Sequence, residues 1–421
     1  MAVPKNAARN VSPVLDSAAD KAQASVRRAS PSGIIGVVML QALDRVPLHL
    51  VLDVLNVGMP LPFRVLDAQD RLLLNAGQLL IDRAQVDALI ERGAWAEKAL
   101  VEATRAAAPA GRPPAAAPTS LFDRWERKLW EFDKLTRAIV RRQIKSGAIC
   151  DFFESIQTMV CRDHDAALFV CVRQDDRRFA LYALTHSLSC AVVSLLCAKQ
   201  LRWAEEKIAS LTCAALTMNL GIFELQAEMA EQRDPPSRKQ IEAIRAHPAA
   251  SAAMLRETGV TDESWLSTVT QHHEHVGGGG YPDGMAHVSE SAQVLRAVDV
   301  LMAKISARAN RPAIPPQTAI RELFQQGQGD LLTTGVVKAV GIHPPGSLVK
   351  LQSGETGVAI RRPGDRPHPI VATLSDRAGK PVAWTHLRDT SQPEFAVLGP
   401  LVDLRLFPRV LPERVYGWIA G

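Results

Sequence analysis

Residues 272–282 read HHEHVGGGGYP and are the part of the chain best suited to chemistry. Imidazole is the commonest side-chain ligand for metal ions, and glycine lets another group approach the backbone closely. A lone histidine is usually a surface or packed residue. Two adjacent histidines followed by four glycines are much less ordinary. The pattern therefore predicts imidazole ligands for a metal ion beside a loop whose backbone another group can approach closely.

Three more possible ligands lie elsewhere in the chain: His186, His247 and Asp299. Each falls on or at the end of a predicted helix, and each taken alone is more often an ordinary residue than a ligand. Side chains from facing helices can nevertheless converge in the interior of a bundle, as the metal sites of helical domains do. The joint case for a metal site depends on the motifs considered below.

Helical periodicity dominates the segment that must position these residues. Predicted helices cover residues 185–201, 206–220, 238–256, 265–275 and 292–307, with no fixed-period repeat. An earlier amphipathic helix begins at Ser120, where Asp123 completes a capping box. Its basic outer face is typical of a solvated surface over a buried stripe; the alternative is a membrane or partner surface.

The predicted fold class is mainly α, with a small domain on each side of the helices. Residues 1–32 are expected to be a disordered arm, residues 33–105 a small α+β module and residues 106–119 an Ala/Pro linker. The module should hold a hairpin around residues 67–70 and a helix from Asp82 to near Gly93, and its role would be that of a sensory or docking cap. Residues 120–340 should form the helical domain.

The C-terminal part, residues 341–421, is predicted to be rich in β-structure. Expected strands cover residues 348–351, 357–361, 370–374 and 382–387, with hairpin turns at 353–356 and 376–380.

Composition narrows the class of protein. The chain has 421 residues, 47% hydrophobic and 22% charged, which excludes a disordered chain, a collagen and a membrane bundle. A net charge of +5 is too mild to predict DNA binding. The six cysteines form no C-x-x-C pair and are expected to be buried free thiols. No secretory leader or membrane span is predicted, so we expect a cytoplasmic protein.

Residues 181–346 resemble the HD-GYP family, the metal-dependent hydrolases of bacterial cyclic-di-GMP and related dinucleotides. The resemblance rests on HHE followed by G-x-G-Y-P, and on the PPGSLVKL segment at 344–351. It implies an HD-GYP-type helical bundle. It also implies metal ligands at His186, His247, His272, His273 and Asp299, and a nucleotide or partner loop containing Gly278, Gly280, Tyr281 and Pro282.

The chain departs from the family where catalysis is concentrated. The defining His-Asp pair falls on Met218 and Asn219, and the phosphate-facing lysine falls on Ile222. The resemblance implies two or three metals sharing that aspartate, with a metal-bound hydroxide as nucleophile. Asn219 offers only a neutral oxygen, and the Met218 thioether suits Fe, Mn or Mg poorly. No catalytic residue is therefore expected at these positions.

Two further family residues are also replaced, because the later aspartate falls on Gly277 and the arginine after HHE falls on His275. The metal position that needs His186 and Asp299 is expected to be empty. The other position keeps three imidazoles, which can hold one metal with open coordination. The sequence thus predicts at most one divalent transition metal (Fe, Mn or Zn), or none.

Three functions can be weighed, and the replacement of the His-Asp pair by Met218 and Asn219 favours the first of them. The first is a degenerate, non-hydrolytic HD-GYP protein that binds cyclic-di-GMP or presents its Gly-Tyr-Pro loop to a diguanylate-cyclase-type or other signalling protein. The second is an active phosphodiesterase that uses a residual metal site. The third is a structural interaction protein without nucleotide or metal affinity. Retention of His247, His272 and His273 favours the first two over the third.

Overall fold

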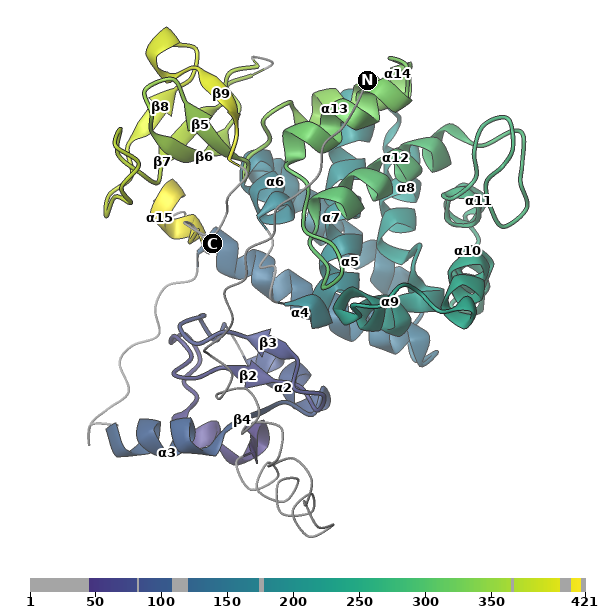
Figure 1. Ribbon diagram of the computed structural model, residues 1–421. Coiled ribbons are helices and arrows are strands. Elements are labelled where there is room, and N and C mark those ends of the chain that lie inside the picture. The colour runs from purple at the N-terminus through teal and green to yellow at the C-terminus, as the bar shows by residue number, and fades with distance from the viewer. Residues whose placement is uncertain are drawn as a thin grey trace, which may run out of the picture.

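The computed structural model has a helical domain with two small antiparallel sheets, one before it and one after it in the chain; in Figure 1 the C-terminal sheet lies at the upper left and the N-terminal sheet at the bottom. The structure describes residues 45–81, 83–107, 120–173, 178–364, 367–401 and 410–417. The predicted arm at 1–32 and residues 108–119 of the predicted linker lie outside the described residues. The mainly α fold class with flanking small sheets is confirmed.

The N-terminal module holds a four-stranded sheet of order β1-β4-β2-β3. Its elements are β1 (Arg45–Pro47), η1 (Leu48–Leu50), η2 (Leu52–Val54), β2 (Val65–Leu66), β3 (Leu72–Leu74), α2 (Arg83–Glu91), β4 (Trp95–Glu97) and α3 (Lys98–Ala107). The predicted hairpin is confirmed, because β2 pairs with β3 and Asp67 Oδ1 accepts hydrogen bonds from the backbone N–H groups of Gln69 and Arg71. The predicted first residue of α2, Asp82, lies outside the described residues.

The helical domain begins with α4, whose capping box is confirmed: Ser120 and Asp123 exchange hydrogen bonds between side chain and backbone. Its helices are α4 (Leu121–Val140), α5 (Gly147–Arg162), α6 (His164–Val172), η3 (Phe179–Leu181), α7 (Tyr182–Gln200), α8 (Glu205–Thr217), η4 (Leu220–Ile222), α9 (Phe223–Glu231), α10 (Arg238–Glu257), α11 (Glu263–Gln271), α12 (Glu290–Ile305), α13 (Pro316–Gln326) and α14 (Leu331–Val340). Helix α7 packs against α8, α12 and α14 and forms the centre of the domain (Figure 1).

Two apolar helical stretches are long enough to cross a membrane by length and composition, namely Phe179–Gln200 and Glu205–Glu231. Their most apolar windows are 83% and 78% buried inside the fold. Burial of this kind is what core helices of a helical domain show, because such helices are apolar on every side.

The C-terminal module is a five-stranded antiparallel sheet of order β8-β7-β6-β5-β9. Its elements are β5 (Leu348–Leu351), β6 (Thr356–Arg361), β7 (Ile370–Thr373), β8 (Leu387–Asp389), η5 (Pro393–Phe395), β9 (Val397–Pro400) and α15 (Pro412–Tyr416). The predicted strand at 382–387 is wrong. Pairing with β7 starts only at Leu387. The preceding residues form a loop in which Trp384 is 83% exposed.

The six cysteines are free, but only four of them are buried. Cys150 and Cys161 are exposed, so the expectation of buried thiols is wrong for these two. Burial raises the pKa of Cys171 and of Cys197 to about 12, which makes both thiols poor nucleophiles at neutral pH.

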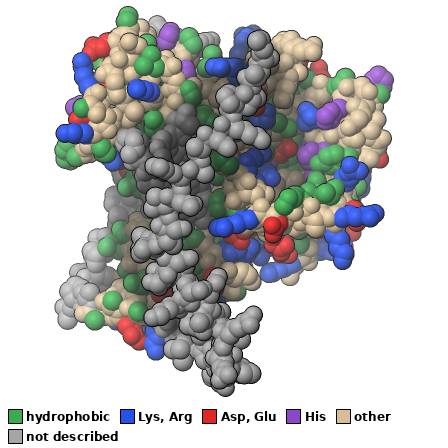
Figure 2. All heavy atoms as spheres, in the orientation of Figure 1, with side chains coloured by type: hydrophobic (Ala, Val, Ile, Leu, Met, Phe, Trp, Pro, Cys, Tyr) green, Lys and Arg blue, Asp and Glu red, His purple; other side chains and the backbone are tan. Residues whose placement is uncertain are grey.

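On the face shown in Figure 2, basic and acidic side chains are interspersed rather than gathered into an extended basic surface.

Candidate metal centre

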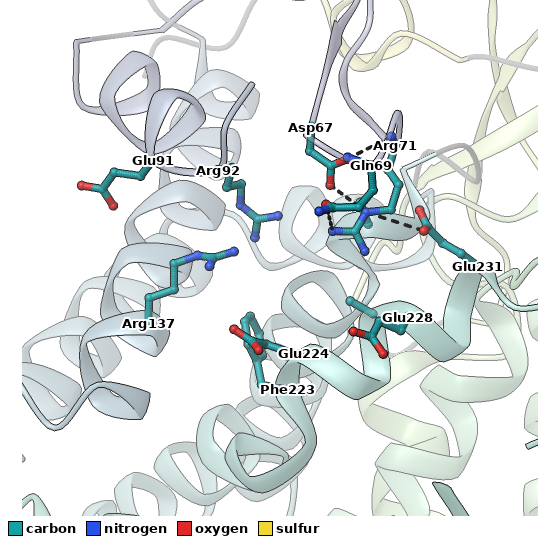
Figure 3. A pocket seen from close by; sticks show the side chains of 12 residues that line it. Asp67, Gln69, Arg71, Glu91, Arg92, Arg137, Phe223, Glu224, Glu228 and Glu231 are labelled. Atoms are coloured by element: carbon teal, nitrogen blue, oxygen red, sulfur yellow. Dashed lines mark hydrogen bonds and ion pairs between the residues drawn. The ribbon is translucent and has the colours of Figure 1, made fainter. Parts of the chain in front are cut away.

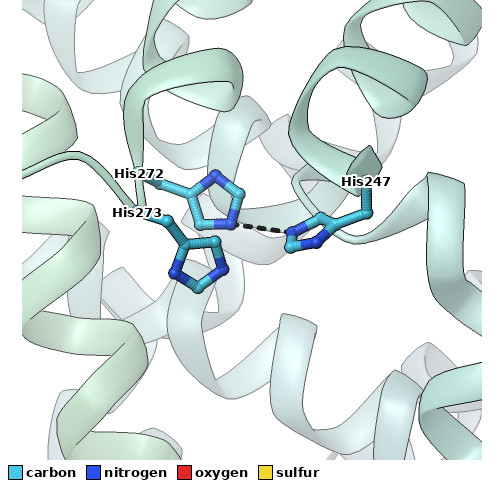
Figure 4. Close-up of side chains that lie close together, drawn as sticks. All are labelled: His247, His272 and His273. Atoms are coloured by element: carbon cyan, nitrogen blue, oxygen red, sulfur yellow. Dashed lines mark hydrogen bonds between the residues drawn. The ribbon is translucent and has the colours of Figure 1, made fainter. Parts of the chain in front are cut away.

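Three imidazoles converge from two helices (Figure 4). His247 lies in α10, and His272 and His273 directly follow the end of α11. Each residue offers one ring nitrogen, and these nitrogens lie within 4.8 Å of one another. His247 and His272 are 1% and 0% exposed, so the cluster is buried on the side of those two rings.

Local hydrogen bonds determine which ring nitrogen can act as a ligand. His247 Nδ1 donates to the carbonyl of Ile244 (2.6 Å), and His272 Nδ1 donates to the carbonyl of Val269 (2.7 Å). In each case the acceptor is the carbonyl three residues earlier, so the same type of hydrogen bond orients both rings. A metal-binding histidine almost always donates its other ring N–H in this way.

The two Nε2 atoms consequently present lone pairs to each other at 3.1 Å. Burial, together with the neighbouring imidazoles, lowers the pKa of His247 and His272 to about 4 and that of His273 to about 3. The rings are therefore neutral at pH 7, and no bound proton relieves the facing lone pairs. A tetrahedral ion with Zn–N bonds of about 2.0–2.1 Å would place two ligand nitrogens roughly 3.4 Å apart, close to the observed separation.

His186 and Asp299 are arranged differently. His186 Nε2 lies 2.7 Å from Asp299 Oδ1, and His186 Nδ1 is buried with no hydrogen-bond partner among the described residues. The ring proton therefore belongs on Nε2, directed at the carboxylate. Burial by itself would raise the pKa of Asp299, but the hydrogen bond from His186 and the nearby imidazoles outweigh it and hold the pKa below its usual range.

Cys190 lies one helical turn after His186, with its Sγ 3.7 Å from His186 Nε2. His186, Cys190 and Asp299 therefore form a second group whose potential ligand atoms lie within 4.8 Å of one another. Cys190 was missed as a neighbour of this position, although its i+4 spacing from His186 places both side chains on one helix face.

Apolar side chains occupy two of the three degenerate positions. Met218 is fully buried and Ile222 is 7% exposed, while Asn219 is 5% exposed. Gly221 holds this segment against α10: its N–H donates to Ser251 Oγ at 2.9 Å, and a Cβ would lie 3.0 Å from the His247 carbonyl oxygen. The segment is thus fixed against the helix that carries His247.

Glu274 organises the glycine loop, a role that sequence reasoning did not assign. This carboxylate is 1% exposed and accepts backbone N–H bonds from Asp283 (2.7 Å), Gly284 (3.1 Å) and Met285 (3.0 Å). Gly280 passes so close that a Cβ there would lie 2.5 Å from the Glu274 Cα. The position of Glu274 in the sequence could have indicated this role, because it lies between the paired histidines and the glycine run.

Tyr281 extends this loop over the metal centre. Its ring stacks on His273 with centroids 4.5 Å apart and an interplanar angle of 20°. Gly278 and Gly280 lead into this contact, and Pro282 follows it.

The other two positions where a family residue is replaced have local roles. His275 Nε2 accepts a hydrogen bond from Arg296 (2.8 Å), and Gly277 adopts a left-handed φ of +87°.

Residues 174–330 match the HD domain family. The chain therefore contains an HD domain. Its HD domain contains both histidine groups and the glycine loop. A cyclic di-GMP phosphodiesterase of Pseudomonas aeruginosa is 27% identical over 226 residues, which cover 52% of this chain and 54% of the relative. The chain thus spans about half the length of that curated relative.

Among solved structures, an HDG"Y"P protein from Bdellovibrio bacteriovorus aligns with a TM-score of 0.45 and 14% identity. The alignment covers 70% of this chain and 98% of that one.

Proposed function

We propose that this HD-domain protein acts in bacterial cyclic-di-GMP signalling by binding nucleotide or a protein partner, without hydrolysing the nucleotide. The observation that carries the proposal is the contrast between the two histidine groups. His247 and His272 direct free lone pairs at one point, whereas His186 directs a proton at Asp299. The first group already presents lone pairs that could hold an ion, whereas an ion at the second group would first have to break the hydrogen bond between His186 and Asp299.

The replaced residues support the loss of two-metal hydrolysis. Asn219 cannot act as an anionic bridge between two ions, and Met218 brings a soft sulfur atom where a hard cation would need nitrogen or oxygen. The three imidazoles of His247, His272 and His273 would hold at most one Fe, Mn or Zn ion. When bound, such an ion supplies Lewis acidity and an open coordination position.

Exposure of the glycine loop supports a binding role. Val276 is 65% exposed and Met285 is 37% exposed, while Glu274 holds the backbone between them in a defined shape. Exposed apolar side chains on an ordered loop are suited to contact with another protein. A diguanylate-cyclase-type or other signalling protein is the partner we propose. We also propose a cytoplasmic location, with which the burial of the apolar stretches Phe179–Gln200 and Glu205–Glu231 in the core is compatible.

A second candidate function is cyclic-di-GMP hydrolysis with a single metal. The observation that favours it is the intact three-imidazole cluster, because one metal with open coordination can in principle activate water. This candidate predicts product formation that depends on the metal and disappears when His272 is replaced.

Turnover of cyclic-di-GMP by purified protein with Mn²⁺ or Fe²⁺ under reducing conditions separates the two. The proposed function predicts no linear dinucleotide or GMP, and His272→Ala serves as the control for contaminating enzyme. The triple variant Met218→His, Asn219→Asp, Ile222→Lys should gain hydrolysis. A triple variant that folds and loads metal but stays inert would contradict our explanation of the loss.

A further inference from the structure

The N-terminal module and the helical domain enclose a cavity of about 630 Å³, which we name the interdomain cleft (Figure 3). The β2–β3 turn contributes Arg71, the end of α2 contributes Arg92, α4 contributes Arg137, and α9 contributes Phe223, Glu224 and Glu228. Its volume falls in the range of roughly 300–1,000 Å³ that small-molecule pockets occupy. Its lining is separate from the histidine cluster.

One side of the interdomain cleft holds two arginines, Arg92 and Arg137, together with the carboxylate of Glu91. Arg92 and Arg137 both bind the single carboxylate of Asp133, with contacts of 2.9 Å from Arg92 Nε and 3.1 Å from Arg137 Nε. Arg137 uses only its Nε for this bond, so its two terminal amino groups have no partner among the described residues. Figure 3 shows both guanidinium groups extending toward the cavity from the same side.

The floor contributed by α9 carries excess negative charge. Glu224 and Glu228 lie one helical turn apart, and neither has an ion-pair partner among the described residues. Glu231 follows on the same face, 3.6 Å from Arg71. Burial, with a contribution from Asp67, raises the pKa of Glu231 despite Arg71, so this side of the cleft would gain from a hydrogen-bond donor.

A ligand that matches both sides has an anionic group at one end and adjacent N–H donors at the other. Guanine is the base that fits, because its N1–H and 2-amino group form a paired donor edge for a carboxylate, whereas adenine lacks the N1–H donor. Phosphate suits the free guanidinium N–H groups of Arg137. Phe223 supplies apolar surface at the cleft.

We propose that the interdomain cleft binds a guanine nucleotide, with its phosphate toward the free amino groups of Arg137 and its base toward Glu224 and Glu228. The proposal adds a second nucleotide site to the proposed function, and it can fail while that function stands. Helix α9 directly follows the segment 218–222, and Gly221 ties that segment to the helix of His247. A ligand in the cleft would therefore contact α9, which follows the segment that Gly221 attaches to the helix of His247.

Calorimetric titration of the full chain with GMP, IMP and AMP tests the site. IMP differs from GMP only by lacking the 2-amino group, so we expect it to bind about tenfold more weakly, and AMP more weakly still, since a hydrogen bond to a charged group is lost. Glu228→Gln should weaken GMP binding by about tenfold or more and leave the metal content unchanged. Arg137→Ala should remove the advantage of GMP over guanosine. The exposed Glu263→Gln variant is the matched control.

Cyclic-di-GMP, titrated into His272→Ala, distinguishes the dinucleotide from the mononucleotide as occupant. Either ligand supports the proposal if its affinity falls in Glu228→Gln. Equal affinities for GMP, IMP and AMP would overturn it, as would the absence of GMP binding at millimolar concentration or loss of binding in His272→Ala with retention in Glu228→Gln.

Discussion

Replacement of Glu274 by glutamine should loosen the glycine loop that covers the histidine cluster. The carboxylate accepts two backbone N–H bonds on Oε1 and one on Oε2. In glutamine one of these oxygens becomes an amino group, which would face the N–H of Met285 as a second donor. A hydrogen bond to a charged group contributes about 1.5–3 kcal/mol, and an unsatisfied buried donor costs about 1–3 kcal/mol.

We therefore expect Glu274→Gln to cost about 2–5 kcal/mol, mainly as a higher population of open loop conformations. Hydrogen exchange read at the amides of residues 283–285 measures this directly, and these amides should exchange at least tenfold faster than in the parent. Glu263→Gln is the control, because Glu263 is a surface carboxylate 3.9 Å from Arg256. Unchanged exchange in Glu274→Gln would refute the assignment of Glu274 as the organiser of the loop.

Three more predictions follow from other contacts. Gly280→Ala should displace the loop, since its Cβ would lie 2.5 Å from the Glu274 Cα, and faster proteolysis of the loop would show it; unaltered cleavage would count against this contact. Arg92→Ala removes the bidentate partner of the buried Asp133, which keeps only the Nε of Arg137, and should lower the free energy of unfolding by about 1.5–3 kcal/mol in urea titrations; an unchanged free energy of unfolding would be inconsistent with that role. The hydrogen bond from Arg388 lowers the pKa of Glu355 below its usual range, so the ionised Glu355 stabilises the fold at neutral pH, and this stabilisation is lost as the pH falls through the lowered pKa. Arg388→Ala should therefore weaken the dependence of the thermal unfolding temperature on acid pH, and an identical dependence in the variant would argue against this role.

Strong periodicity explains why much of the helical domain could be predicted from the sequence. The helix predicted at 238–256 is α10, whose start is marked by the Ser237 capping box, and the strand predicted at 348–351 is β5, which a Pro-Pro-Gly turn precedes. The strand predicted at 382–387 was wrong because β-structure there depends on pairing with β7, which starts only at Leu387. Local apolar residues do not specify where such long-range pairing begins.

The histidines and Asp299 of the two groups were predicted from the sequence, but Cys190 and the hydrogen bonding of both groups were not. The ring orientation of His247 depends on a carbonyl three residues earlier, and the lack of a partner for His186 Nδ1 among the described residues depends on what packs around that ring. Both features decide which ring nitrogen has a free lone pair for a metal ion, and both depend on side-chain conformation within the fold. The interdomain cleft was equally out of reach, because it needs the N-terminal module docked on α9.

Metal stoichiometry of the purified protein after loading with Zn²⁺ and removal of excess ion tests the central claim most directly. The account predicts at most one equivalent per chain, absent from His272→Ala and unchanged in Asp299→Asn. Two equivalents in the parent, or one equivalent that survives in His272→Ala but is lost in Asp299→Asn, would contradict it.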